Sequence, residues 1–174
     1  MSNGFVIHRK GPDVEKANYA MIMLHGRGSD INDMKSVIPA LHLENVHIVI
    51  LQAPIEIMLG RYAWYRYFWN ENLEQNLKDL NNSFNILEHC IADLEQYGID
   101  EKNIMLFGHS QGANLILEFF SQKNFPLKSV IALRGCFLGE YSIDRNFDDE
   151  SLPENTKVIL HAGRNDPYIP FKKV

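Results

Sequence analysis

A serine flanked by two glycines constrains the fold of this chain more than any other feature. The apolar run IMLF before it predicts a buried strand, residues 108–112 (GHSQG) predict a tight turn, and the run ANLILEFF after it predicts a helix. A G-x-S-x-G turn between a strand and a helix is typical of a nucleophile elbow, which lifts the serine above the sheet edge. Gly108 and Gly112 fit this geometry because a Cβ at either position would clash where the two backbones crowd together. Ser110 is therefore predicted to be a catalytic nucleophile, and the alternative is a structural turn serine.

The composition is that of one ordinary globular domain spanning residues 1–174. Hydrophobic residues make up 45% and charged residues 22% of the chain, and the length is sufficient for a sizeable core. The net charge of −5, without any basic cluster, argues against a nucleic-acid-binding protein. Cys90 and Cys136 lie far apart and have no paired spacing, which favours buried thiols over a disulfide framework or a metal site.

The expected location of the protein is the cytoplasm. The N-terminus lacks both a basic start and a long apolar segment, so no signal peptide is predicted. No apolar run approaches the length that spans a membrane. Two cysteines that are expected to remain thiols also indicate a reducing compartment.

Continuous apolar runs alternate along the chain with helical or irregular segments. Besides the run before Ser110, strands are predicted at 5–8, 19–24, 46–51, 129–133 and 157–161. The alternation indicates the α/β class, with a mostly parallel, doubly wound sheet. In such a sheet, sites form beyond the carboxyl ends of the strands. The loops at 25–30, 108–112 and 162–170 each follow a strand and are expected to converge.

Two further helices are predicted. Asp30 is expected to cap the first, and Pro39 to kink or end it; its residues at helical spacing are Ile31, Met34, Val37, Ile38 and Leu41. The second runs from about 71 to 97 and is ended by Gly98. Its leucine seam would also fit a coiled coil, but a helix laid on a sheet is favoured because strands precede and follow it. Residues 52–70 are expected to form an irregular connection.

Two backbone groups and one carboxylate supply most of the machinery that a serine hydrolase requires besides its nucleophile. The backbone N–H of Gln111, at the start of a helix, is one predicted oxyanion donor. The backbone N–H of Arg27, in a glycine-rich loop after an early strand, is the other. Asp166 follows a strand end and comes after Ser110 in the chain, as expected of the acid that orients the base. A plain turn aspartate is the alternative.

No histidine follows Asp166, where the order of triad residues places the base. The seven histidines are His8, His25, His42, His47, His89, His109 and His161. His25 is expected to fix the oxyanion loop, His109 to point away from the nucleophile, and His161 to be structural. The sequence as given therefore does not contain a complete triad.

Five segments, in order along the chain, match the motifs of one known family. They are 24–30 (LHGRGSD), 52–54 (QAP), 63–65 (AWY), 108–112 (GHSQG) and 161–170 (HAGRNDPYIP). In these segments the chain resembles the phospholipase/carboxylesterase family of α/β-hydrolases, which includes acyl-protein thioesterases. The resemblance implies the α/β-hydrolase fold. It also implies Ser110 as nucleophile, Asp166 as triad acid, and oxyanion donors at Arg27 and Gln111.

The same resemblance implies an acyl or alcohol pocket near Trp64 and Tyr65, and no metal or organic cofactor. Two details depart from the family pattern. His109 stands where the family more often has an aromatic residue, and the HAG run at 161–163 replaces an adjacent His-Gly pair.

The family continues beyond the last matched segment with a helix, a strand, a histidine-bearing loop and a final helix. We therefore expect a C-terminally truncated chain, with the triad histidine beyond residue 174 and one sheet edge left uncovered.

The leading hypothesis is a serine hydrolase that cleaves a carboxylic ester or thioester through an acyl-enzyme at Ser110. The alternative is a non-catalytic protein that binds acyl or ester ligands and lacks the triad histidine. Hydrolysis of a lactone would use the same machinery. The expected partner is a small-molecule or acyl ester substrate, without nucleic acid or a membrane span, and the sequence is compatible with a monomer or a homo-oligomer.

Overall fold

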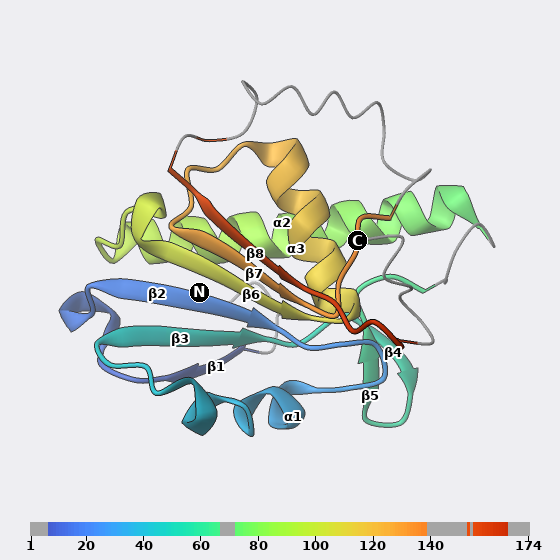
Figure 1. Ribbon diagram of the computed structural model, residues 1–174, viewed down its shortest axis with the longest axis horizontal. Helices are drawn as coiled ribbons and strands as arrows, with labels where there is room; N and C mark the ends of the chain where they lie inside the picture. Colours follow the sequence, from blue (N-terminus) through green and yellow to red (C-terminus); the bar gives the residue numbers. More distant parts are fainter. Residues whose placement is uncertain (1–6, 67–71, 139–152, 154, 167–174) are drawn as a thin grey trace.

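Six strands form one mixed sheet in the spatial order β1-β3-β2-β6-β7-β8 (Figure 1). The computed structural model describes residues 7–66, 72–138, 153 and 155–166 of the 174-residue chain. The strands are β1 (Ile7–Lys10), β2 (Tyr19–Leu24), β3 (Val46–Leu51), β6 (Ile104–His109), β7 (Ser129–Leu133) and β8 (Lys157–His161). Neighbouring strands are parallel except for the antiparallel pair β1 and β3. The predicted mostly parallel sheet is confirmed. The edge strand predicted at 5–8 is β1, and residues 5 and 6 lie outside the described part.

Helices cover both faces of this sheet (Figure 1). They are α1 (Ile31–Lys35), α2 (Leu73–Gln96) and α3 (Gln111–Lys123), with short 3₁₀ helices at Val14–Lys16, Ile38–Leu41 and Glu101–Asn103. Successive residues of a strand point to opposite faces. In β2, Ile22 and Leu24 join the core under α2 and α3, whereas Met21 and Met23 join the core under α1. None of the described helices has the length and apolar character needed to cross a membrane.

α2 lies on the sheet, as predicted, and is not part of a coiled coil. Its apolar seam packs into the core that it shares with α3; the buried residues of the seam are Leu80, Phe84, Leu87, Ile91 and Leu94. The side chain of Asn72 caps the helix by accepting a hydrogen bond from the N–H of Gln75. Gly98 follows the helix with a φ of 91°, which explains why the helix ends there.

The helix after Asp30 is shorter than the sequence pattern predicts. Asp30 does cap α1, because its carboxylate accepts hydrogen bonds from two backbone N–H groups of the first turn. However, α1 ends at Lys35, and the segment Ile38–Leu41 forms a separate 3₁₀ helix. Pro39 accounts for the break, since it has no N–H and its ring would clash with the carbonyl of Lys35 in a continuous helix.

The described part of the connection at 52–70, residues 52–66, is also more regular than predicted. It contains a two-stranded hairpin, β4 (Ile55–Met58) and β5 (Arg61–Ala63). The strands are too short for a clear alternation, and the glycine at their turn, Gly60 with a φ of 69°, was the available signal. The hairpin supports the loop after β2, because Gly28 N–H donates to Tyr62 O at 2.8 Å and Tyr62 N–H donates to Ser29 O at 3.2 Å.

Candidate active site

Ser110 occupies the turn between β6 and α3 in a strained backbone conformation. Its φ is 51° and its ψ is −118°, a combination that residues with a Cβ rarely adopt. Ser110 N–H donates to Leu133 O at 2.8 Å, and Ser110 O accepts from Asn114 N–H at 3.0 Å. Such strain persists only where the surrounding structure over-determines it, and it clusters at functional sites. The strand, turn and helix predicted from the sequence are all present.

The two glycines that flank Ser110 lie where no side chain fits. A Cβ at Gly108 would be 2.5 Å from the carbonyl oxygen of Gly112. A Cβ at Gly112 would be 2.6 Å from the carbonyl oxygen of Leu24, at the end of β2. Both neighbours are backbone atoms, which cannot rotate away. The close contacts of α3 with β6 and β2 therefore require glycine at both positions, as predicted.

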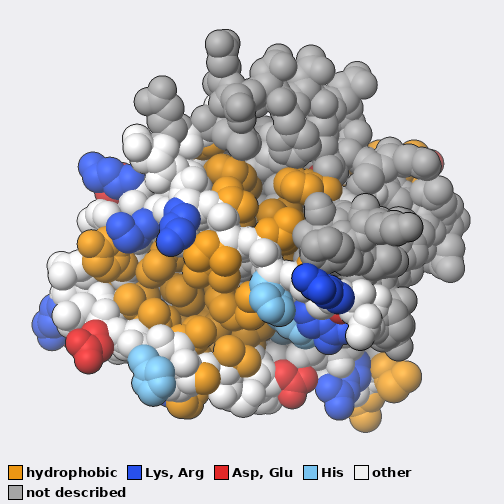
Figure 2. All heavy atoms as spheres, in the orientation of Figure 1, with side chains coloured by type: hydrophobic (Ala, Val, Ile, Leu, Met, Phe, Trp, Pro, Cys, Tyr) orange, Lys and Arg blue, Asp and Glu red, His pale blue; other side chains and the backbone are white. Residues whose placement is uncertain are grey.

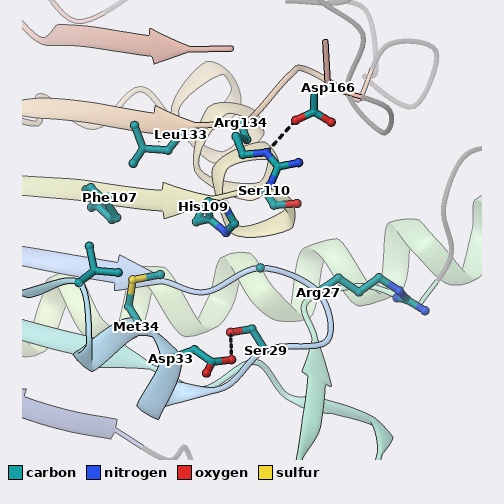
Figure 3. A pocket seen from close by; sticks show the side chains of 12 residues that line it. Arg27, Ser29, Asp33, Met34, Phe107, His109, Ser110, Leu133, Arg134 and Asp166 are labelled. Atoms are coloured by element: carbon teal, nitrogen blue, oxygen red, sulfur yellow. Dashed lines mark hydrogen bonds and ion pairs between the residues drawn. The ribbon is translucent and has the colours of Figure 1, made fainter. Parts of the chain in front are cut away.

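A cavity of about 560 Å³ opens beside Ser110 at the carboxyl end of the sheet (Figure 3). The loop after β2 contributes Gly26 and Arg27, the elbow contributes Ser110, and the loop after β8 contributes Asp166. The apolar part of the lining consists of Met34, Val37, Phe107 and Leu133, and Asp33 of α1 lines the cavity beside it. The three loops that were expected to converge do so, the third of them as far as residue 166, since 167–170 lie outside the described residues.

Asp166 reaches this cavity and is paired with an arginine that the sequence pattern did not single out. Nε of Arg134 donates to Oδ2 of Asp166 at 2.7 Å (dashed line in Figure 3). The Asp166 side chain is 3% exposed, whereas the Arg134 side chain is 46% exposed. Arg134 directly follows β7 at the same sheet edge as the other site loops, and this position was the signal that could have identified it. The candidate site therefore contains an ion pair as well as a serine.

His25 is buried and fixes the glycine-rich loop after β2. Its Nδ1 lies 2.8 Å from Gly26 O, and its Nε2 lies 3.1 Å from the backbone N of Ala53 and 2.9 Å from Nε2 of Gln52. This hydrogen-bond pattern assigns the proton to Nδ1, which donates, while Nε2 accepts from Ala53 N–H. Burial lowers the pKa of His25 and so favours the neutral ring. The imidazole braces the loop, in agreement with the expectation from the sequence.

Comparison with known proteins identifies the family. The sequence model of the phospholipase/carboxylesterase family matches residues 6–173. The chain belongs to this family. Acyl-protein thioesterase 1 of Kluyveromyces lactis is 29% identical over 113 residues, which are 63% of this chain and 49% of that protein. The alignment thus spans about half the length of this curated relative.

Solved structures of similar proteins share the fold. The enzyme from Dyadobacter fermentans aligns with a TM-score of 0.81 and 27% identity, over 98% of this chain and 78% of that one. The carboxylesterase of Bacillus cereus aligns with a TM-score of 0.74 over 99% of this chain and 76% of that one. The second pair is only 18% identical and shows a likeness of fold alone. The α/β-hydrolase fold implied by the sequence is confirmed.

In this phospholipase/carboxylesterase chain, the side chains of the two predicted oxyanion donors are hydrogen-bonded to the backbone of the segment after β5. Arg27 lines the cavity, but its side chain turns away from it (Figure 3), and Nη1 donates to Tyr65 O at 3.0 Å. Gln111 directly follows Ser110 as the first residue of α3. Its buried side chain accepts from Trp64 N–H at 2.9 Å and donates to Tyr65 O at 2.8 Å. The backbone N–H groups of both residues remain the predicted donors.

Trp64 and Tyr65 are buried in the scaffold behind the elbow. Trp64 has no exposed surface, and its Nε1 donates to His25 O while its carbonyl accepts from Ser83 Oγ, both at 2.8 Å. The hydroxyl of Tyr65 accepts from Nδ2 of Asn114 at 3.2 Å, and burial raises the pKa of Tyr65. Neither residue is among the described residues that line the cavity. Their contacts brace the site loops, and the substrate contact predicted for them stays a prediction.

His109 lines the same cavity as Ser110. A Cβ at Gly26 would be 3.2 Å from both His109 Nδ1 and Ser110 Cβ, so the loop after β2 packs against both residues. Burial and the charge of Arg134 lower the pKa of His109, and Asp166 opposes this shift. Figure 3 shows the imidazole and the serine hydroxyl pointing in different directions, as expected from the sequence.

The remaining candidates from the sequence have structural contacts. The carbonyl of His161, at the end of β8, accepts from Arg134 N–H at 2.7 Å. Cys90 and Cys136 are buried thiols outside any disulfide, as predicted, and burial raises the pKa of Cys90 to about 12. Within the described ranges, no group of three or more His, Cys, Asp or Glu side chains could hold a metal ion.

Proposed function

We propose that the full-length protein is a serine hydrolase that cleaves a carboxylic ester or thioester through an acyl-enzyme at Ser110. The observation that carries this proposal is the strained elbow, with a φ of 51° at Ser110, beside a cavity that also receives Asp166 and the loop of Arg27. Membership of the phospholipase/carboxylesterase family supports the same chemistry. The proposed substrate is a small-molecule or acyl-chain ester, and this chemistry requires no cofactor.

In the proposed reaction, the hydroxyl oxygen of Ser110 attacks the substrate carbonyl carbon while its proton passes to a histidine base. The backbone N–H groups of Gln111 and Arg27 stabilise the negative charge that develops on the carbonyl oxygen. Collapse of the tetrahedral intermediate expels the alcohol or thiol, which takes the proton from the histidine. Water then attacks the acyl-enzyme with the help of the same groups, which releases the acid and restores Ser110.

We propose that the base is a histidine beyond residue 174, oriented by Asp166. His25 is a poor candidate because both of its ring nitrogens are hydrogen-bonded inside the loop that it braces. His109 points in a different direction from the Ser110 hydroxyl (Figure 3). The nearly buried carboxylate of Asp166 suits a group that stabilises an imidazolium.

The apolar wall of the cavity supports an acyl substituent on the substrate. Met34 and Val37 form its α1 side, and Phe107 and Leu133 form its sheet side. An acyl chain that leaves water against such a wall gains about 25 cal/mol for each Å² of apolar surface buried. Ser110 and the polar groups near it would then orient the ester carbonyl.

A non-catalytic ligand-binding protein is the second candidate. The ion pair between Asp166 and Arg134 favours it. A histidine base would require the Asp166 carboxylate as its partner, and in this structure that carboxylate is bonded to an arginine. The same cavity would then hold an acyl or ester ligand without turnover. The two candidates differ in whether Ser110 is chemically activated.

The intact mass of the full-length protein, before and after treatment with a fluorophosphonate, separates the two candidates. A hydrolase acquires one adduct, because the reagent modifies activated serines, and Ser110→Ala abolishes it. Ser121→Ala, near the other end of α3, is the matched control and should leave the adduct unchanged. An unmodified wild-type protein would favour the binding candidate. Full ester hydrolysis by Ser110→Ala would also contradict the hydrolase proposal.

A further inference from the structure

The reaction proposed above uses the cavity serine and carboxylate but gives no part to the arginine that contacts this carboxylate. We propose that Arg134 is a positioning residue, which fixes the Asp166 carboxylate and places a positive charge beside the base that Asp166 orients. The inference rests on the proposed function and adds a residue to the same site. Its geometry is independent of that function.

The backbone of Arg134 is held in place at the carboxyl end of β7. Its φ is 54°, in a region that non-glycine residues rarely adopt. Its N–H donates to the carbonyl of His161 at 2.7 Å, which joins β7 to the end of β8. The following Gly135 lies against α3, where an added Cβ would be 2.6 Å from the Cβ of Ala113. The side chain therefore starts from a fixed point, and its strained backbone is typical of a functional site.

The ion pair joins a buried carboxylate to a half-exposed guanidinium. With 3% of its side chain exposed, Asp166 has lost most of its contact with water and requires compensation for its charge. The separation of 2.7 Å between Nε of Arg134 and Oδ2 of Asp166 is that of a charge-assisted hydrogen bond. Because the guanidinium is planar and rigid, this bond also restricts the orientation of the carboxylate.

The other charged groups around the cavity are arranged differently. Oδ2 of Asp33, on the α1 side, lies 3.5 Å from Nη1 of Arg61. The guanidinium of Arg27 donates to the backbone carbonyl of Tyr65. His109, from the end of β6, lines the cavity near the pair, and its pKa is lowered by burial and by Arg134. The charge of Arg134 thus already disfavours protonation of one imidazole at this rim.

The same charge should disfavour protonation of the triad base. Asp166 stabilises the protonated histidine, whereas the guanidinium beside Asp166 opposes protonation. The neutral histidine, which accepts the serine proton, then persists to lower pH. Removal of the arginine charge should shift the acid limb of the rate profile upward by about 0.5 to 1 pH unit, since the half-exposed guanidinium is partly screened by solvent.

The rate of fluorophosphonate labelling at Ser110 of the full-length protein, measured from about pH 5 to pH 9, tests this inference. Arg134→Gln and Arg134→Met should raise the midpoint of the acid limb by about 0.5 to 1 pH unit, whereas Arg134→Lys keeps the charge and should stay near the wild type. Lys123→Met is the matched control, because it removes one positive charge from a partly exposed pair with Glu88, outside the cavity lining. Labelling that slows equally at every pH, with an unshifted midpoint, would overturn the inference.

A double-mutant cycle tests the pairing without reference to catalysis. Melting temperatures are compared for Arg134→Gln, Asp166→Asn and the double variant. Asp166→Asn removes the charge that Arg134→Gln leaves without its partner, so the double variant should lose less than the sum of the single losses. Additive losses would overturn the positioning role. Absence of labelling in the wild type would instead overturn the proposed hydrolase function, so the two failures are distinguishable.

Discussion

Ser110 keeps its positive φ because the backbone around it is fixed from three directions. Gly108 and Gly112 let β6, α3 and the end of β2 approach one another too closely for any side chain. The N–H of Ser110 donates to Leu133 O, which ties the turn to β7. The position of the candidate nucleophile is therefore set by backbone packing.

Gly108→Ala should destabilise the protein by about 1–3 kcal/mol, which is the usual cost of overpacking. The new Cβ would lie 2.6 Å from the backbone N of Ala113, so α3 must shift and displace Ser110. Denaturant unfolding measures the stability, and slower fluorophosphonate labelling reports the displacement. Gly98→Ala is the control, since nothing lies within 4 Å of its Cβ and only its positive φ opposes the change. Equal labelling of the two variants would contradict the argument.

Asp166→Asn should lower kcat for ester hydrolysis about 10⁴-fold if Asp166 is the triad acid. An amide in this position cannot hold the base in the required tautomer or stabilise its protonated form. Steady-state hydrolysis by the full-length protein measures the effect. Asp100→Asn, at an exposed turn outside the cavity lining, should leave kcat unchanged. An Asp166→Asn variant with nearly wild-type kcat would show that the base is oriented by another group.

The stability of the protein should fall with acidity in a way that depends on His25. Burial lowers the pKa of His25 below its ordinary value of 6.5, so below that pH the unfolded chain binds a proton that the folded chain excludes. The stability that this group supports at pH 7 is therefore lost as the pH falls from 6.5 towards the folded-state pKa. His25→Asn should have a lower melting temperature at pH 7 and a smaller decrease between about pH 7 and pH 5. Because the pKa of His109 is also lowered, the His25→Asn variant should still show part of the decrease in melting temperature.

The matched control for this pH dependence is His89→Asn. His89 lies exposed on α2, outside the cavity lining. Its replacement should preserve the wild-type difference in melting temperature between the two pH values. A pH dependence that is identical in the wild type and in His25→Asn would show that the buried imidazole does not govern acid sensitivity in this range.

At the scale of elements, the strands β2 and β3 were predicted with the right bounds because their runs are almost entirely apolar, as expected where both faces of a strand are covered. His47 of β3 is the exception, and its Nδ1 lies 2.9 Å from the carbonyl oxygen of Pro12. The segments that were missed lie at the periphery, where a local cause decides the structure. Pro39 splits the helix after Asp30, and the short hairpin β4–β5 depends on pairing with the loop after β2.

The candidate site was predictable where it follows the order of the chain. Ser110, Asp166 and the loop of Arg27 each come after a strand, and a parallel sheet gathers such positions at one edge. The pairing of Arg134 with Asp166 joins residues 32 positions apart and depends on a left-handed backbone, which no local pattern encodes. The aromatic character of Trp64 indicated burial but could not decide between the cavity and the core.

The buried side chain of Gln111 connects α3 to the segment after β5. Replacing this side chain should therefore lower the stability of the protein. Gln111→Met keeps the length of the side chain but leaves Trp64 N–H and Tyr65 O without this partner. We expect a loss of about 1–3 kcal/mol in the free energy of unfolding, chiefly from the buried N–H of Trp64, because Tyr65 O still accepts from Nη1 of Arg27. Gln122→Met, exposed near the other end of α3, should change it by less than about 0.5 kcal/mol. Equal losses in the two variants would contradict the proposed connection.

At the scale of the whole molecule, the two edges of the sheet differ. β1 closes one edge as an antiparallel strand, whereas β8 forms the other edge with apolar residues exposed on both faces. Val158 is 45%, Ile159 39% and Leu160 37% exposed. Figure 2 shows hydrophobic side chains gathered on the sheet face above α1, where Ile131 of β7 packs against the core under that helix. Ile159 is the β8 partner of Ile131 and extends this face to the edge.

The 174-residue chain, prepared alone, should therefore self-associate through the edge and face of β8. An edge strand with unpaired backbone groups and exposed apolar side chains pairs readily with another copy, and a charge on such a strand opposes this pairing. Ile159→Lys should lower the apparent molar mass in sedimentation velocity and delay the increase in light scattering with concentration. Leu59→Lys, at the 94% exposed tip of the β4–β5 hairpin, introduces the same charge away from the edge and should leave the association unchanged. An equal effect of both substitutions would assign the association to general surface hydrophobicity, and no effect of Ile159→Lys would exclude the β8 edge as its cause.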